Sequence, residues 1–170
     1  MKICILSDSH DNRQLLEQSV KQAVADGAET ILHCGDVVAA GTLSVLYKYN
    51  LPIHVIHGNN AGDSYTMHRV VEKSQGLITY HGQDAGMVLA DKRIFIVHYP
   101  HYAEAMALTG DWDLVCFGHD HEVAVRTITN VKGKQTVLAN PGTVAGIGAN
   151  PTYIIADLNK MEFDVHEVTV

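Results

Sequence analysis

Apolar segments of strand length alternate with helical ones over the first third of the chain, and few folds accommodate this pattern. The apolar segments are residues 2–7, 30–34 and 52–57. Residues 11–26 carry their apolar side chains at the spacing of one helical face, and a second helix is expected over about 41–49. Strands that alternate with helices form parallel sheets with right-handed crossovers. The sequence therefore predicts a parallel sheet at the start of the fold.

The pattern changes after residue 76 to short strands with few helices between them. Strands at 77–80, 86–90 and 93–98 are expected to form antiparallel hairpins. One helix is expected at about 101–109, and the remaining strands are 113–117, 122–128, 135–139, 151–157 and 161–169. We expect an α/β fold in which two sheets pack together with helices outside. The 170 residues fit one domain, residues 1–170.

Composition excludes several classes of protein. Hydrophobic residues make up 46% of the chain, which excludes a disordered protein, and no apolar segment approaches the ~20 residues of a membrane span. The net charge of −7 argues against a nucleic-acid polymer as partner, since phosphates attract basic surfaces. The chain starts directly with an apolar strand, which leaves no room for a signal peptide. Three cysteines in apolar segments predict buried reduced thiols and a cytoplasmic protein.

Eleven histidines are present, and several of them follow apolar strands directly. Ligands of α/β proteins bind at the carboxyl ends of strands, because loops project side chains there from a rigid edge. Glycines at 35, 58 and 118 would let the backbone turn sharply at these ends. The polar residues of metal-ligand type at the strand ends are Asp8, His10, Asp36, Asn59, His98, His119 and His121.

This set of residues suits divalent metal ions. Asp8 and His10 are two residues apart, as are His119 and His121, so each pair can direct both side chains to one side of an extended chain. Carboxylate or amide oxygens combined with imidazoles favour Mn²⁺, Fe²⁺, Co²⁺, Ni²⁺ or Zn²⁺. Seven ligands exceed what one tetrahedral ion needs, whereas two ions that share a carboxylate would use all of them.

The ordered motifs resemble those of the calcineurin-like metallophosphoesterase superfamily, and in particular its small single-domain bacterial and archaeal phosphodiesterases. The matching segments, in order, are DSH (8–10), GD (35–36), GN (58–59), His98, GHDH (118–121) and NPGT (140–143). The resemblance implies a four-layer α/β/β/α sandwich, with two packed mixed β-sheets flanked by helices.

The resemblance also implies a binuclear metal centre. The first metal would be held by Asp8, His10, Asp36 and His121, and the second by Asp36, Asn59, His98 and His119. Mn²⁺ would be the preferred ion, with Ni²⁺, Fe²⁺, Zn²⁺ and Co²⁺ as alternatives. A hydroxide that bridges the metals would attack the phosphorus of a small phosphodiester.

One position departs from the family pattern. Asn60 and Ala61 follow the motif asparagine, where the superfamily has His and the small branch often has Cys and then Asp. The amide of Asn60 cannot deliver a proton, so the usual leaving-group acid is missing from this catalytic position. We expect His101 to supply the proton or to contact the phosphate.

The sequence therefore predicts a metal-dependent phosphoric ester hydrolase that acts on a small phosphodiester. Two alternatives stay open: a phosphomonoesterase or nucleotidase that uses the same site, and a catalytically weak binding module of the same fold. His33 is expected to support the site rather than to bind metal, and Asp120 to point away from its neighbouring histidines. The turn at 140–143 either joins two strands or shapes the rim of the metal cleft. A homo-oligomer is compatible with the sequence.

Overall fold

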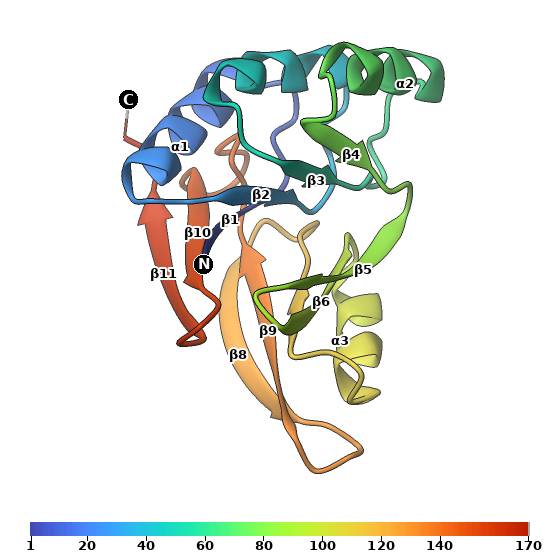
Figure 1. Ribbon diagram of the computed structural model, residues 1–170, viewed down its shortest axis with the longest axis vertical. Helices are drawn as coiled ribbons and strands as arrows, with labels where there is room; N and C mark the ends of the chain where they lie inside the picture. The colour runs from blue at the N-terminus through green and yellow to red at the C-terminus, as the bar shows by residue number, and fades with distance from the viewer. Residues whose placement is uncertain (170) are drawn as a thin grey trace.

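Two β-sheets pack face to face, with helices on both outer sides (Figure 1). The computed structural model describes residues 1–169. The first sheet has strand order β11-β10-β1-β2-β3-β4, and its strands are β1 (Lys2–Leu6), β2 (Thr30–His33), β3 (Ile53–Val55), β4 (Ile78–Tyr80), β10 (Thr152–Asp157) and β11 (Glu162–Glu167). The second sheet has order β5-β6-β7-β9-β8, and its strands are β5 (Asp84–Leu89), β6 (Lys92–Val97), β7 (Leu114–Cys116), β8 (Val123–Thr129) and β9 (Gln135–Pro141).

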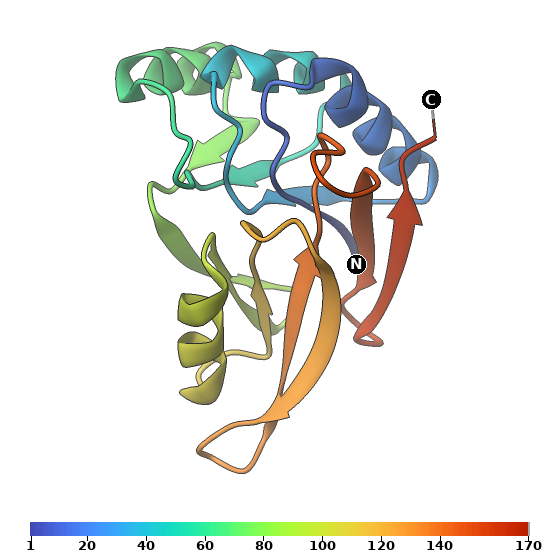
Figure 2. The same cartoon turned by 180° about the vertical axis from the view of Figure 1, so that it is seen from behind.

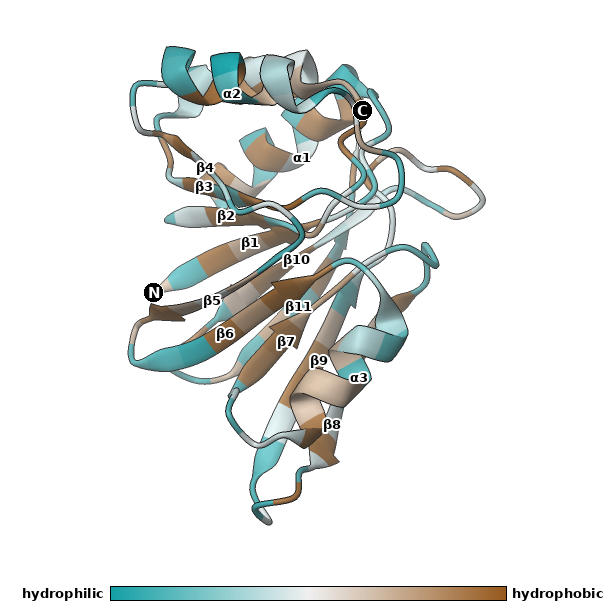
Figure 3. Ribbon diagram, turned by 90° about the vertical axis from the view of Figure 1, so that its right-hand side faces the viewer, coloured by the Kyte–Doolittle hydropathy of each residue, from teal (hydrophilic) through white to brown (hydrophobic). Residues whose placement is uncertain are grey.

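The helices divide between the two outer faces. The first sheet is covered by α1 (Arg13–Ala25), the 3-10 helix η1 (Ala40–Tyr49) and α2 (Ser64–Lys73). The second sheet is covered by α3 (Pro100–Leu108), which Figure 3 shows against its outer face. The four layers confirm the expected α/β/β/α sandwich. No helix within residues 1–169 has both the length and the apolar character needed to cross a bilayer.

The predicted parallel start of the fold is confirmed. Strands β1, β2, β3 and β4 pair in parallel, with Cys4 opposite Ile31 and Ile31 opposite Ile53. Helix α1 starts after Asn12, whose side-chain oxygen accepts a hydrogen bond from the amide of Leu15 at 3.1 Å and so satisfies a free helix donor.

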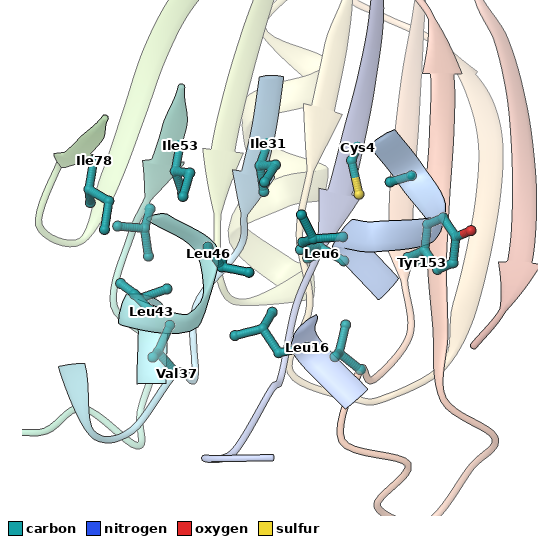
Figure 4. Close-up of a cluster of buried hydrophobic side chains, with 14 of the residues drawn as sticks. Cys4, Leu6, Leu16, Ile31, Val37, Leu43, Leu46, Ile53, Ile78 and Tyr153 are labelled. Carbon is teal, nitrogen blue, oxygen red and sulfur yellow. The ribbon is translucent and has the colours of Figure 1, made fainter. Parts of the chain in front are cut away.

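Alternating side chains of β1 divide between two apolar cores. Cys4 and Leu6 face α1 and η1, whereas Ile3 and Ile5 face the second sheet. Figure 4 shows part of the helix-facing cluster, in which the strand side chains lie against Leu43 and Leu46 of η1. A third cluster joins α3 to the outer face of the second sheet. Burial on both faces of these strands explains their continuous apolar sequence.

Two elements differ from expectation. Strands β4 and β5 do not form a hairpin: β4 pairs with β3, and the chain then crosses to the second sheet, where β5 pairs with β6 (Figure 2). The sequence of a strand this short does not indicate which neighbouring strand it pairs with. Helix α2 has no counterpart among the expected elements, because it is a largely polar segment in which only Met67 and Val70 are buried.

Candidate metal centre

All seven candidate ligands lie at strand carboxyl ends, and both sheets contribute. Asp8 and His10 follow β1, Asp36 follows β2 and Asn59 follows β3. His98 follows β6, and the two histidines of the GHDH turn follow β7. The sandwich brings these ends together, so that side chains more than 100 residues apart in sequence come within 3.3 Å of one another.

Asp8, His10 and His121 form one group of potential ligand atoms. The Oδ1 atom of Asp8 lies 3.3 Å from Nε2 of His121 and 3.6 Å from Nε2 of His10. The two imidazole Nε2 atoms are themselves 3.3 Å apart. Three donor atoms this close, facing a common point, are suited to one cation.

A second group consists of Asn59, His98 and His119. The Oδ1 atom of Asn59 lies 3.0 Å from Nε2 of His98 and 2.8 Å from Nδ1 of His119. An amide oxygen with two imidazole nitrogens is again a donor set for a borderline divalent ion.

Asp36 lies between the two groups. Its Oδ2 is 3.6 Å from Nε2 of His10 in the first group, and its Oδ1 is 3.4 Å from Nε2 of His98 in the second. The residue is 2% exposed, so its carboxylate faces the ligand atoms rather than solvent. This is the position that a carboxylate shared between two cations requires.

One buried oxygen has no partner. The Oδ1 atom of Asp8 is buried and accepts no hydrogen bond from the described residues, whereas its Oδ2 accepts one from the backbone amide of His119 at 3.0 Å. A buried carboxylate oxygen without a partner is costly unless a cation or donor satisfies it. The donor set therefore fits a metal ion at Asp8.

Backbone carbonyls orient two of the imidazoles. His98 Nδ1 lies 2.8 Å from the carbonyl oxygen of Cys34, and His121 Nδ1 lies 2.8 Å from that of Ile147. A carbonyl only accepts, so each Nδ1 carries the proton and each Nε2 keeps its lone pair toward the ligand group. Sequence reasoning missed both contacts, because backbone carbonyls leave no motif.

The backbone of the site is strained. Asp8, His10, Asp36, His119 and His121 all have positive φ angles, between 39° and 81°. Residues other than glycine adopt such angles rarely and at a cost of about 1–3 kcal/mol each when they are forced, and these residues cluster at functional sites.

Two motif glycines, Gly58 and Gly118, allow the ligands to approach the backbone closely. A methyl group on Gly58 would lie 2.2 Å from Oδ1 of Asp36 and 2.6 Å from Nε2 of His98. One on Gly118 would lie 2.6 Å from Oδ2 of Asp8. Neither glycine has a positive φ angle. The ligands can therefore converge only because these positions lack a side chain.

His33 lies beneath the site as a neutral residue. It is completely buried, its Nε2 is 3.0 Å from the hydroxyl of Ser9, and its Nδ1 accepts a hydrogen bond from the amide of Gly35. Burial is the main reason that the pKa of His33 falls to about 3, and the nearby His98 lowers it further.

The NPGT segment (140–143), whose first two residues end β9, supports the rim of the site. The amide of Asn140 donates to Oδ1 of Asp120 at 2.6 Å, so this aspartate is directed away from the ligand group. The hydroxyl of Thr143 donates to the carbonyl of Asp8 at 3.0 Å. The NPGT segment thus contacts both loops that carry candidate ligands, the one with Asp8 and the one with the GHDH histidines.

The two predicted catalytic residues, Asn60 and His101, have different surroundings in the structure. Asn60 contacts Asp36 directly: its backbone amide donates to Oδ1 at 2.8 Å and its side-chain amide donates to Oδ2 at 2.7 Å. His101 is exposed in the first turn of α3, with its ring 5.7 Å from that of Tyr99. The ring of Tyr99 in turn lies 5.0 Å from that of His119. His101 therefore lies beside the ligand group, with one aromatic ring between.

Comparisons with known proteins agree with this geometry. The family description of the calcineurin-like phosphoesterase superfamily domain matches residues 1–161. The chain belongs to this superfamily. It is accordingly a metal-dependent phosphoric ester hydrolase.

Relatives of this calcineurin-like phosphoesterase cover almost its whole length. Phosphodiesterase MJ0936 of Methanocaldococcus jannaschii is 27% identical over 168 residues, which is 96% of each chain. A solved archaeal phosphodiesterase superposes with a TM-score of 0.88 at 25% identity, and covers 98% of this chain and 99% of its own.

More distant structures share the fold alone. Yfce, a phosphoesterase from E. coli, has a TM-score of 0.67 at 19% identity, with 99% of this chain and 100% of that one covered. Vps29 from Entamoeba histolytica, complexed with zinc, has a TM-score of 0.68 at 16% identity and covers 98% of this chain and 91% of its own.

Proposed function

We propose that residues 1–170 form a single-domain phosphodiesterase that hydrolyses a small phosphodiester at a two-metal site. The observation that carries the proposal is the position of Asp36, within 3.6 Å of an imidazole in each of the two ligand groups. Further support comes from the relative named a phosphodiesterase, which is 27% identical over 96% of each chain.

The proposed ligands divide between the two ions. The first ion would be held by Asp8, His10, Asp36 and His121, and the second by Asp36, Asn59, His98 and His119. Mn²⁺ is the ion we propose, since the mixture of oxygen and imidazole donors suits it; Fe²⁺, Co²⁺, Ni²⁺ and Zn²⁺ suit the same donors. Bound ions would supply a hydroxide nucleophile at neutral pH and positive charge for the phosphoryl oxygens.

The chain's own residues orient this site. Asn60 donates to both oxygens of Asp36 and so fixes the plane of the shared carboxylate. The carbonyls of Cys34 and Ile147 hold the imidazoles of His98 and His121 in the tautomer that presents Nε2.

We assign His101 to the leaving-group side of the site. It is exposed, with its ring 5.7 Å from that of Tyr99 and 4.3 Å from that of Tyr102, and an imidazole at this place could donate a proton to the leaving group or bind the phosphate. His101→Ala should alter the pH profile of kcat/KM. An unchanged profile contradicts the assignment.

The substrate proposal is a small ester rather than a polymer. The net charge of −7 disfavours a long polyanion. The three cysteines are buried and free, which supports a cytoplasmic location.

Hydrolysis of bis(p-nitrophenyl) phosphate tests the function. The chelator-treated protein should gain activity when Mn²⁺ is added, Asp36→Asn should lose it, and Asp91→Asn, the same change at an exposed turn, should keep it. A clear preference for p-nitrophenyl phosphate would favour a monoesterase. Metal binding without hydrolysis of either ester would favour the weak binding module.

A further inference from the structure

A pocket lies beside α3, on the outer face of the second sheet. Its apolar wall includes Phe95 and Val97 of β6 and Met106 of α3, and its volume is about 180 Å³. Sites that enclose a whole small ligand typically measure about 300–1,000 Å³. This pocket therefore has room for one part of a molecule, such as a single ring system.

Aromatic side chains lie between the pocket and the candidate metal centre. Tyr102, which is 49% exposed, forms one wall of the pocket. Its ring lies 5.9 Å from that of Tyr99, which lies 5.0 Å from that of His119. Val97 and His98 are consecutive, and Val97 faces the pocket while His98 faces the ligand group. Tyr99 is thus the one aromatic ring between the pocket wall at Tyr102 and the ligand group at His119.

Polar side chains complete the pocket. Gln83 and Asp84 line it, and neither side chain forms a hydrogen bond or ion pair with any of residues 1–169. A glutamine amide offers both a donor and an acceptor, and an aspartate offers acceptors. A flat ring against Tyr102 would therefore find hydrogen-bonding partners for its polar edge. A nucleobase has this combination of a stacking face and a polar edge, whereas a simple alkyl or phenyl group does not.

We propose that this pocket binds the nucleobase of a nucleoside phosphodiester whose phosphate lies at the metal centre. The inference rests on the proposed phosphodiesterase function and names its substrate class. Tyr102 stacks on the base, and Gln83 and Asp84 contact its edge. The pocket then determines which esters the enzyme hydrolyses, and its residues take no part in the cleavage of the P–O bond.

Three esters with the same leaving group separate base recognition from chemistry. Thymidine and adenosine 5′-(p-nitrophenyl phosphate) are compared with methyl p-nitrophenyl phosphate, all with Mn²⁺. Wild-type kcat/KM should be higher for at least one nucleoside ester. Because stacking contributes about 1–3 kcal/mol per base, Tyr102→Ala should lower that value roughly 5- to 150-fold. The same variant should change kcat/KM for the methyl ester by less than about twofold, and Tyr102→Phe should behave as wild type.

Tyr65→Ala is the matched control, since Tyr65 is an exposed tyrosine of α2 outside this pocket. Equal kcat/KM for the nucleoside and methyl esters in the wild type, or equal losses for both in Tyr102→Ala, would overturn the proposal.

A binding measurement does not depend on turnover. Calorimetric titration with thymidine and adenosine 5′-monophosphates should show binding to the wild type that Tyr102→Ala weakens at least about fivefold. Binding that depends on Tyr102, without hydrolysis of any ester, would support the base-binding pocket and contradict the phosphodiesterase function. The opposite result is hydrolysis of all three esters with no mononucleotide binding, or with binding that Tyr102→Ala does not change. It would contradict the proposed base-binding pocket and leave the phosphodiesterase function intact.

Discussion

Asn60 donates two hydrogen bonds to Asp36, one from its backbone amide at 2.8 Å and one from its side chain at 2.7 Å. The residue that departs from the family pattern is thus a direct partner of the proposed bridging carboxylate. An amide donates at every pH, so this support does not depend on protonation. Asn60 is in this respect a positioning residue of the metal centre.

Removal of the Asn60 side chain should weaken metal binding. Asn60→Ala keeps the backbone hydrogen bond but loses the one to Oδ2 of Asp36. Loss of such a supporting contact typically costs about 10- to 100-fold in metal affinity, and we expect a fall in that range. Calorimetric titration with Mn²⁺ measures it, and wild-type affinity in the variant would contradict the role.

The absence of an acid at position 60 should make hydrolysis sensitive to the leaving group. With aryl phosphodiesters of increasing phenol pKa, kcat/KM should fall, because residue 60 gives no proton to the departing phenolate and His101 is left as the only proposed donor. Asn60→His restores a titratable group there and should flatten the dependence, by up to about 10²–10⁴-fold for the poorest leaving group. If plots of log kcat/KM against the phenol pKa have the same slope for the wild type and Asn60→His, residue 60 does not face the leaving group.

Gly58→Ala should disrupt the site more than the fold. The added methyl group would lie 2.2 Å from Oδ1 of Asp36, so the carboxylate or the loop has to move. We expect at least a tenfold loss of metal affinity, with the far-ultraviolet circular dichroism unchanged. Gly41→Ala is the matched control, because no heavy atom lies within 4 Å of a methyl group placed there. Equal affinities in the two variants would contradict this account.

Acid should destabilise the fold through His33. Its pKa is about 3 in the folded protein and about 6.5 in the unfolded chain, so below pH 6.5 the unfolded chain takes up a proton that the folded state excludes. The free energy of unfolding should therefore fall with decreasing pH, by up to about 1.4 kcal/mol per pH unit from this residue between about pH 6.5 and pH 3.

Urea unfolding between pH 7.5 and 5, with a chelator present, measures the effect. His33→Asn should make the free energy of unfolding fall less steeply with decreasing pH. His68→Asn, the same substitution at an exposed histidine, is the control and should leave the slope unchanged. A decline of the same slope in wild type and His33→Asn would show that His33 does not cause it.

The parallel start of the fold and the composition of the site follow from local sequence. Polar residues directly after apolar strands predicted that Asp8, Asp36 and His98 belong to one site, and the structure brings them within ligand distance of one another from the ends of two different sheets. The pairing of β4 was not predictable, because a three-residue strand leaves its partner to tertiary packing. The carbonyl of Ile147 and the contact between Asn60 and Asp36 depend on loop conformation, which the sequence pattern does not determine.

The number of metal ions bound per chain tests the central claim most directly. Chelator-treated protein is loaded with Mn²⁺, desalted and analysed for metal, alongside Asp36→Asn and the surface control Asp91→Asn. The account predicts two ions per chain in the wild type and the control, and fewer than two in Asp36→Asn. One ion or none in the wild type, or two ions retained by Asp36→Asn, would contradict it.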